Sequence, residues 1–206
     1  MTRKRGKFIV LLGVNGTGKS TQAQLLAEKI RTEAGNEVKY VKYPIYGLEP
    51  TGPMINSYLR EGNPHKFSSR EFQILHAFNR TAFEPRLTEF FESGVHVVAE
   101  DYVETSLAWG IAKGVEKKFL LELNSHLLEP DIRVFFNGRP YGTDREKNHL
   151  HESNMKLVER VFKEHQRLAK EFKWKTIDLY DEEKEPFGEA EIHERVWGLI
   201  DKSLDL

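Results

Sequence analysis

Residues 13–20 read Gly-Val-Asn-Gly-Thr-Gly-Lys-Ser, and this stretch decides the fold of the chain. It matches the phosphate-binding loop motif G-x-x-x-x-G-K-[ST] at every fixed position. The apolar run Phe8–Leu12 precedes it and a helical pattern follows it, which is the strand–loop–helix context that the motif requires. Glycines let backbone N–H groups approach a phosphate, and the helix start adds the positive end of its dipole. This context favours a nucleotide site over the alternative, a chance glycine-rich loop.

The side chains at the end of this loop predict ATP and Mg²⁺ as cofactors. Lys19 can reach the β- and γ-phosphates of a nucleotide, and the hydroxyl of Ser20 can ligate Mg²⁺. We therefore expect Lys19 to be catalytic and Ser20 to bind the metal. The residues expected to surround the nucleotide are Gly13, Asn15, Gly16, Thr17, Gly18, Lys19, Ser20 and Thr21.

Composition limits the class of protein further. The 206 residues carry a formal net charge of -1, contain no cysteine and fit one α/β domain spanning residues 1–206. The balanced charge gives no support for a nucleic-acid partner, and the lack of cysteine excludes disulfides and thiol catalysis. No apolar run approaches the ~20 residues needed to span a bilayer. We expect a globular protein without a membrane partner, compatible with a cytoplasmic location.

Short apolar segments alternate with helical patterns along the chain, which predicts an α/β fold. Because the segments are rich in β-branched residues and apolar on both faces, they indicate buried parallel strands. Right-handed crossovers then give a three-layer arrangement, in which a five-stranded parallel sheet carries helices on both faces. The predicted strands are Phe8–Leu12, Val38–Tyr43, Val95–Glu100, Ile132–Phe136 and Lys175–Leu179.

A polar segment at about 138–151 separates the fourth predicted strand from a long helical pattern. It carries Arg139 and Arg145, and phosphoryl transfer requires both exclusion of water and neutralisation of charge. We therefore interpret the segment as a lid loop with these two arginines as catalytic candidates. The alternative is an ordinary surface loop with basic residues.

The same segment contains His149 and His151, followed by Glu152. Two imidazoles and a carboxylate can ligate zinc, but nothing else in the sequence completes the coordination. The favoured interpretation is that His151 and Glu152 begin the next helix and order the lid.

Two carboxylates, Glu100 and Asp101, directly follow the third predicted strand. In doubly wound sheets ligands gather at the carboxyl ends of the strands. An acid at this place can hold the Mg²⁺ shell or act as a general base toward a substrate hydroxyl, and Glu100 is our candidate for both roles. The alternative is an acid that only caps the helix that follows.

Ser68 with Glu71 predicts a helix start of the capping-box type. Along that helix Phe72, His76 and Arg80 recur every four residues and therefore share a face. This face could grip a nucleotide, with a ring on the base and the guanidinium on a phosphate. Alternatively, Phe72 packs into the core and Arg80 pairs with an acid, and spacing alone does not separate the two.

At this point the residues resemble the thymidylate kinases, a family of the nucleoside monophosphate kinase superfamily of P-loop kinases. The similarity runs in order to about Asp178, and beyond the loop its segments are individually loose. The segments that carry it are Thr21-Gln22, Tyr43-Pro44, Glu49-Pro50-Thr51, Tyr58-Leu59-Arg60, Phe78-Asn79-Arg80, Glu100-Asp101-Tyr102, Thr105 and Trp109.

The resemblance implies that ATP phosphorylates thymidine monophosphate. It implies Arg80 on the acceptor phosphate, His76 in the place of a base-stacking aromatic, and Asn15 near the acceptor sugar. It places Arg139 or Arg145 on the transferring phosphoryl group and implies a homodimer, with the acceptor helix as its candidate interface. The expected acceptor site consists of Asn15, Tyr43, Tyr46, Phe72, His76, Arg80, Asp101, Tyr102, Thr105 and Trp109.

The sequence departs from the family pattern at four positions. Asn15 and Leu12 replace an aspartate and a frequent glutamate, while Asp101 and Tyr46 stand where the family has arginines. Like charges in a partly desolvated site cost on the order of several kcal/mol, so Asp101 disfavours an acceptor phosphate unless another cation compensates.

These departures keep two other functions open. A deoxynucleoside kinase would act on an uncharged nucleoside, with Glu100 taking the proton from its 5′-hydroxyl. A nucleotide-binding regulatory protein would retain ATP binding without turnover.

Overall fold

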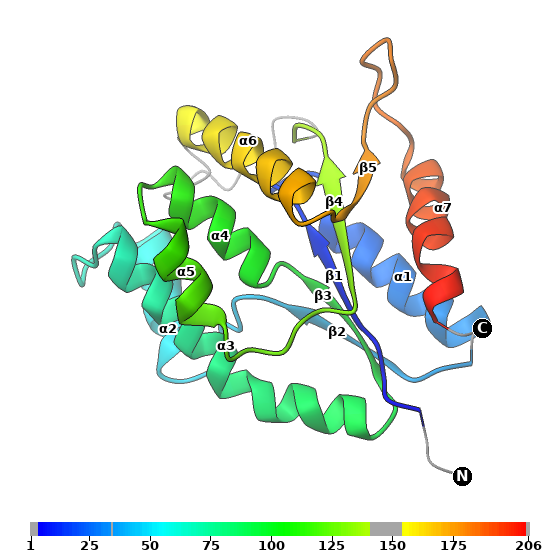
Figure 1. The fold of residues 1–206 in the computed structure, drawn as a ribbon, viewed down its shortest axis with the longest axis horizontal. Coiled ribbons are helices and arrows are strands. Elements are labelled where there is room, and N and C mark those ends of the chain that lie inside the picture. Colours follow the sequence, from blue (N-terminus) through cyan, green and yellow to red (C-terminus); the bar gives the residue numbers. More distant parts are fainter. Residues whose placement is uncertain (1–3, 34, 141–153, 205–206) are drawn as a thin grey trace.

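The computed structural model describes residues 4–33, 35–140 and 154–204. Its centre is a five-stranded parallel sheet in the order β2-β3-β1-β4-β5 (Figure 1). The strands are β1 (Phe8–Leu12), β2 (Val38–Lys42), β3 (His96–Glu100), β4 (Ile132–Asn137) and β5 (Lys175–Asp178). The helices are α1 (Lys19–Glu33), α2 (Thr51–Arg60), α3 (Ser69–Glu92), α4 (Val103–Ala112), α5 (Lys117–Asn124), α6 (Met155–Glu171) and α7 (Glu189–Ile200).

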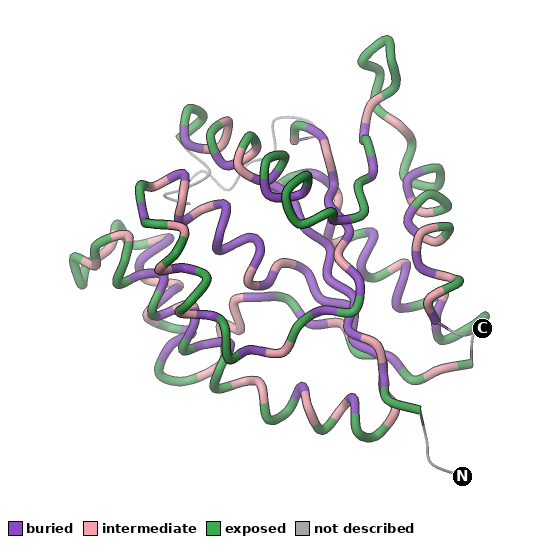
Figure 2. The backbone as a smooth tube through the Cα atoms, viewed as in Figure 1, coloured by how far each residue is buried: buried purple, intermediate pink, exposed green. Residues whose placement is uncertain are grey.

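The sheet separates two apolar layers because alternate side chains of its strands point to opposite faces. From β1, Phe8 and Val10 pack with α3, α4 and α6, whereas Ile9 and Leu11 pack with α1 and α7. Every residue of β1 and β3 is buried, as Figure 2 shows in the central strands. Burial on both faces explains why these segments are continuously apolar, and the predicted three-layer fold is confirmed.

The predicted strand ends shift by a residue at several places. Strand β2 ends at Lys42 rather than Tyr43, because Pro44 follows and has no N–H to continue the ladder. Strand β4 continues one residue further, to Asn137.

Two features place functional segments at one edge of the sheet. The loop 13–20 follows β1, and Glu100 ends β3, which is the neighbour of β1 with Leu11 opposite Glu100.

Helix α3 begins with the predicted capping box, in which the Ser68 side chain accepts from the Glu71 N–H and the Glu71 carboxylate accepts from the Ser68 N–H. Among the described residues, no helix is both long enough and apolar enough to cross a membrane.

Candidate active site

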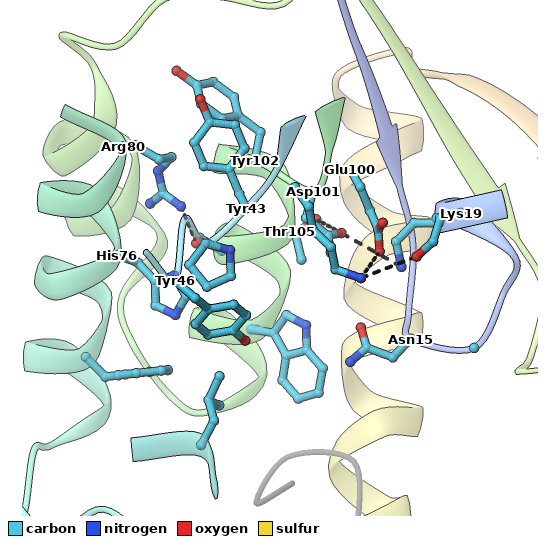
Figure 3. Close-up of a pocket in the computed structure, with 18 of the residues that line it drawn as sticks. Asn15, Lys19, Tyr43, Tyr46, His76, Arg80, Glu100, Asp101, Tyr102 and Thr105 are labelled. Atoms are coloured by element: carbon cyan, nitrogen blue, oxygen red, sulfur yellow. Dashed lines mark hydrogen bonds and ion pairs between the residues drawn. The ribbon is translucent and has the colours of Figure 1, made fainter. Parts of the chain in front are cut away.

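A cavity of about 590 Å³ opens at the carboxyl ends of β1, β2 and β3. The loop 13–20 lines one end, and α3 and α4 line the other (Figure 3). Most of the residues expected from the sequence therefore meet in one space. Those that line the cavity are Asn15, Gly16, Gly18, Lys19, Ser20, Thr21, Tyr43, Tyr46, Phe72, His76, Arg80, Glu100, Asp101, Tyr102, Thr105 and Trp109.

Lys19 is held at the loop end of the cavity by backbone oxygens. Its ammonium donates to the carbonyls of Gly13 and Val14, both at 2.9 Å, and the residue is 3% exposed. The conformation of the loop depends on glycine, since Gly16 has a φ of +78° and a Cβ there would lie 3.1 Å from the Pro140 Cβ. The Lys19 ammonium also lies 3.8 Å from Asp101 Oδ1, and it can exchange its carbonyl contacts for an anion in the cavity.

Ser20 and Glu100 form a cluster of oxygen atoms beside Lys19. The Lys42 ammonium lies 2.9 Å from Glu100 Oε1 and 3.3 Å from Ser20 Oγ, and the Tyr40 hydroxyl donates to Glu100 Oε2 at 2.7 Å. Burial acts to raise the pKa of Glu100, but Lys19, the Ser20 hydroxyl, Lys42 and Tyr40 together outweigh it and lower that pKa. The carboxylate is therefore ionised at neutral pH.

This oxygen cluster fits a magnesium ion. Mg²⁺ prefers hard oxygen ligands and is held by one or two carboxylates or hydroxyls together with the phosphates of its nucleotide. Ser20 and Glu100 offer one hydroxyl and one ionised carboxylate at the loop that would carry the phosphates. Within the described residues no group of three or more His, Cys, Asp or Glu side chains could hold a metal alone. The zinc hypothesis concerns His149, His151 and Glu152, which lie outside the described residues.

Asp101 points into the middle of the cavity from an unusual backbone conformation. Its φ is +61°, and its Oδ1 accepts from the Thr105 hydroxyl at 2.8 Å and lies 3.8 Å from the Lys19 ammonium. Burial raises the pKa of Asp101 to about 6; Lys19 opposes this rise and Glu100 adds to it. The predicted acceptor site thus contains an acid beside the phosphate-binding lysine.

Arg80 lies across the cavity from Lys19, with Asp101 between them (Figure 3). Its guanidinium is 2% exposed and donates to Ser106 Oγ at 2.8 Å and to Asn124 Oδ1 at 2.9 Å. Burial lowers the pKa of Arg80 to about 10, and the charged or titratable neighbours that act on it are Tyr102, Tyr43 and Glu104. Glu100 and Asp101, the carboxylates near the loop 13–20, are not among these neighbours. Arg80 therefore lies at the end of the cavity away from the loop.

Aromatic rings surround this far end. Phe72 stacks on Tyr58 with ring centroids 3.6 Å apart, and the His76 ring meets the edge of Phe72 at 4.6 Å. Phe72 is 1% exposed and belongs to an apolar cluster with Ile55, so it both packs in the core and lines the cavity. His76 is the more accessible ring, which makes it the better surface for a planar base.

The predicted lid arginines lie elsewhere or outside the described residues. Arg139 is 74% exposed, and its guanidinium is 3.7 Å from Glu159 Oε1, beside a second, smaller cavity that Val14 and Pro140 also line. Arg145 and lid residues 141–151 lie outside the described residues. Gly13 and Thr17 support the loop rather than line the cavity, since Thr17 Oγ1 donates to the Val14 carbonyl.

Seven residues of the site were not predicted from the sequence, and three of them, Pro44, Leu59 and Arg60, line the cavity. Lys42 and Gln73 also line the cavity, and Ser106 and Asn124 hold Arg80. Lys42 carried a signal, because it directly precedes Tyr43 at the carboxyl end of a predicted strand. Asn124 carried none, since only the folded chain brings α5 against α3.

Comparisons with known proteins point to one family. The family model described as Thymidylate kinase matches residues 12–187 of the chain. The thymidylate kinase of Schizosaccharomyces pombe is 27% identical over 185 residues, which cover 86% of this chain and 83% of that protein. A probable thymidylate kinase of Thermococcus kodakarensis is 32% identical, covering 86% and 87%.

Solved structures of thymidylate kinases from other organisms share the fold. The solved structure of thymidylate kinase from Candida albicans superposes with a TM-score of 0.78 at 19% identity, covering 97% of this chain and 92% of that one. A crystal structure of thymidylate kinase from Ehrlichia chaffeensis gives a TM-score of 0.72 at 20% identity, covering 96% and 99%. The match of the family model over most of its length places this chain in the thymidylate kinase family.

Proposed function

We propose that this chain transfers the γ-phosphoryl group of ATP to dTMP, which gives ADP and dTDP. The observation that carries the proposal is the single cavity that joins a phosphate-binding loop to an aromatic end built around a buried arginine. Membership of a family of phosphotransferases supports the reaction class. A nucleotide monophosphate fits this arrangement with its base among the rings and its phosphate toward Lys19.

At the donor end, the residues act mainly by positioning charge. Lys19 exchanges its bonds to the carbonyls of Gly13 and Val14 for the β- and γ-phosphates, because phosphate oxygens are stronger acceptors than carbonyls. Ser20 and Glu100 would hold Mg²⁺, which supplies neutralisation of the charge that develops on the phosphates. Arg139 or Arg145 would approach the transferring group when the lid closes.

At the acceptor end, the geometry favours a role for Arg80 that differs from the one expected from the sequence. Its place opposite Lys19 supports a contact with the base rather than with the acceptor phosphate. A guanidinium only donates hydrogen bonds, so it suits a carbonyl edge such as that of thymine. His76 would stack on the base, Tyr46 and Trp109 would enclose it, and Asn15 would face the sugar.

A deoxynucleoside kinase is the second candidate, and Asp101 is the observation that favours it. Its carboxylate lies where the 5′-phosphate of dTMP would approach. Arg60 also lines the cavity, with its guanidinium 4.9 Å from the centre of the Tyr46 ring. An uncharged nucleoside would avoid repulsion by Asp101, with Glu100 as the base toward the 5′-hydroxyl. Lys19 and Lys42 are the cations that would offset Asp101 if dTMP is the acceptor.

The experiment offers dTMP and thymidine separately with ATP·Mg²⁺ and follows ADP release. We expect turnover with dTMP and a loss of about a hundredfold to a thousandfold in kcat for Lys19→Met, as for removal of one charge-stabilising group. Lys39→Met, an exposed lysine of β2, is the matched control and should retain full activity. Turnover of thymidine alone would establish the second candidate, and ATP binding without any transfer would establish the regulatory alternative.

The proposal includes a homodimer that uses the exposed face of α3. Ile74 and Phe78 are 45% and 53% exposed, although both are large apolar residues. They continue along the helix into a stripe with Ala82 and Pro85, which are also exposed. A stripe of this kind on a helix with a buried opposite face is typical of a contact between subunits.

A further inference from the structure

Arg80 is buried, and among the residues that the structure describes no carboxylate forms a hydrogen bond or ion pair with it, although the charge of Glu104 acts on it from beyond that distance. Its Nη1 donates to a serine hydroxyl and its Nη2 to an amide oxygen, and both acceptors are neutral. Its Nε has no hydrogen-bond partner although it is buried. Buried charges are ordinarily paired, so a guanidinium fixed only by neutral groups needs a physical reason.

Asn124 is the partner that shows how the arrangement is built. It ends α5, is 6% exposed and does not line the cavity. Its Nδ2 donates to the Leu120 carbonyl at 2.7 Å, which leaves Oδ1 as the atom that faces Arg80. The orientation of the amide is therefore fixed by its own helix, and Asn124 presents an acceptor to Arg80 at 2.9 Å.

We propose that Asn124 is a positioning residue that fixes Arg80 while leaving its guanidinium without a direct ion pair, so that its charge can act on the acceptor nucleotide. An aspartate could accept the same hydrogen bond from Arg80, but it would pair with the guanidinium and would lose the bond that Nδ2 donates to the Leu120 carbonyl. The amide gives orientation without neutralisation, as does the Ser106 hydroxyl on the other Nη atom. This inference rests on the proposed function, in which Arg80 contacts the acceptor.

The proposal separates binding from stability. Burial disfavours the charged form of Arg80, and a carboxylate at position 124 would favour it at the cost of the bond to the Leu120 carbonyl. Asn124→Asp should therefore be more stable than Asn124→Ala, which loses both bonds of the amide. The same carboxylate should weaken acceptor binding, because a paired guanidinium is a poorer donor to a ligand than an unpaired one. A merely structural role for Asn124 predicts instead that stability and binding change in the same direction.

The test compares Asn124→Asp, Asn124→Ala and the wild type, with Asn36→Asp as the matched control. Asn36 lies in the loop before β2, at the amino ends of the strands, whereas the cavity lies at their carboxyl ends. Asn36→Asp adds the same charge as Asn124→Asp. Dissociation constants for dTMP and for thymidine are measured by calorimetry without ATP, and melting temperatures are measured on the same samples. Neither readout depends on turnover.

For Asn124→Asp we expect dTMP and thymidine to bind about tenfold more weakly, as when a charge-assisted hydrogen bond becomes an ordinary one, with a melting temperature above that of Asn124→Ala. For Asn124→Ala we expect a loss of about threefold with a lower melting temperature, because the charge remains and one neutral hydrogen bond disappears. Asn36→Asp should match the wild type in both.

Three outcomes would overturn the inference alone: Asn124→Asp binding dTMP within twofold of the wild type, Asn124→Ala losing at least as much affinity as Asn124→Asp, or a melting temperature for Asn124→Asp below that of Asn124→Ala. A wild-type protein that binds neither dTMP nor thymidine would overturn the proposed function as well, so the two failures are distinguishable.

Discussion

Asp101 places a carboxylate where the family pattern has an arginine, and its effect can be measured at one atom. Asparagine has the same shape and tolerates a positive φ such as the +61° found here, so Asp101→Asn removes the charge without straining the backbone. We expect the KM for dTMP to fall about fivefold, since Lys19 and Lys42 offset most of the repulsion between Asp101 and a phosphate and leave about 1 kcal/mol. Steady-state kinetics at varied dTMP provide the measurement.

Thymidine is the internal comparison for this variant, because it lacks the phosphate that Asp101 would repel. Its dissociation constant should stay unchanged, and Asp201→Asn, beyond the end of α7, should leave the kinetics unchanged. If dTMP and thymidine gained affinity equally, Asp101 would not act on the acceptor phosphate.

For single residues, the sequence predicted which residues form the site better than it predicted where each of them lies in the cavity. The loop 13–20 and the pair Glu100 and Asp101 were recognisable because a local motif and a strand end define them. The partners of Arg80 were not, since Ser106 and Asn124 stand 26 and 44 residues away along the chain. Which end of the cavity Arg80 occupies depends on the packing of α3, and spacing along one helix does not contain that information.

At the scale of elements, helix starts were predictable where the capping chemistry is local. The Ser68 and Glu71 side chains cap α3 within three residues of each other, so the predicted start is confirmed. Helix α6 differs, because its contact with β4 includes a histidine that the apolar pattern did not single out. His165 is 0% exposed, stacks on Phe135 with ring centroids 5.7 Å apart, and has no hydrogen-bond partner at Nε2.

This histidine predicts that acid weakens the packing of α6. Burial lowers the pKa of His165 to about 3, whereas the unfolded chain has an ordinary histidine near 6.5. Between these values the unfolded state binds a proton and the native state does not, so the free energy of unfolding falls as pH falls below 6.5. At pH 5 this amounts to about 2 kcal/mol for one group.

His165→Phe keeps the aromatic stack on Phe135 and removes the titrating group. Urea unfolding at pH 7.5 and pH 5.0 should show the wild type losing about 2 kcal/mol more stability than the variant, because other groups titrate equally in both. His65→Phe, at an exposed position, should lose as much as the wild type. An equal loss of stability for His165→Phe and the wild type would mean that His165 takes up its proton over the same pH range in the folded and the unfolded protein.

At the scale of the whole molecule, the sheet order brings the donor and acceptor ends together. Strands β1 and β3 are neighbours although 83 residues lie between Leu12 and His96 along the chain, and their carboxyl ends form one edge. The alternation of apolar strands and helices was sufficient to predict this fold, because parallel strands with right-handed crossovers allow few arrangements. It was not sufficient to predict which faces of α3 meet the cavity and which meet solvent.

The exposed face of α3 makes the assembly state testable with one substitution. Phe78 is the most exposed large apolar residue of the stripe, and Phe78→Glu would place a charge at the centre of a helix-to-helix contact. Burying an unpaired carboxylate is far more costly than burying a ring, so the variant should be a monomer at concentrations where the wild type is a dimer. Sedimentation velocity across a range of concentrations measures this directly.

Phe172→Glu is the matched control, since this ring is 42% exposed just beyond α6 and lies off the stripe. It should leave the dimer intact, which would show that the charge acts through its position on α3 rather than through a general effect on solubility. A wild-type protein that sediments as a monomer at every concentration would refute the proposed dimer. A Phe78→Glu variant that still sediments as a dimer would place the contact on another face.

Phe78 points away from the cavity that Arg80 lines two residues later, so the monomer should still bind dTMP. Loss of dTMP binding in the monomer would indicate that dimerisation orders the acceptor site through α3.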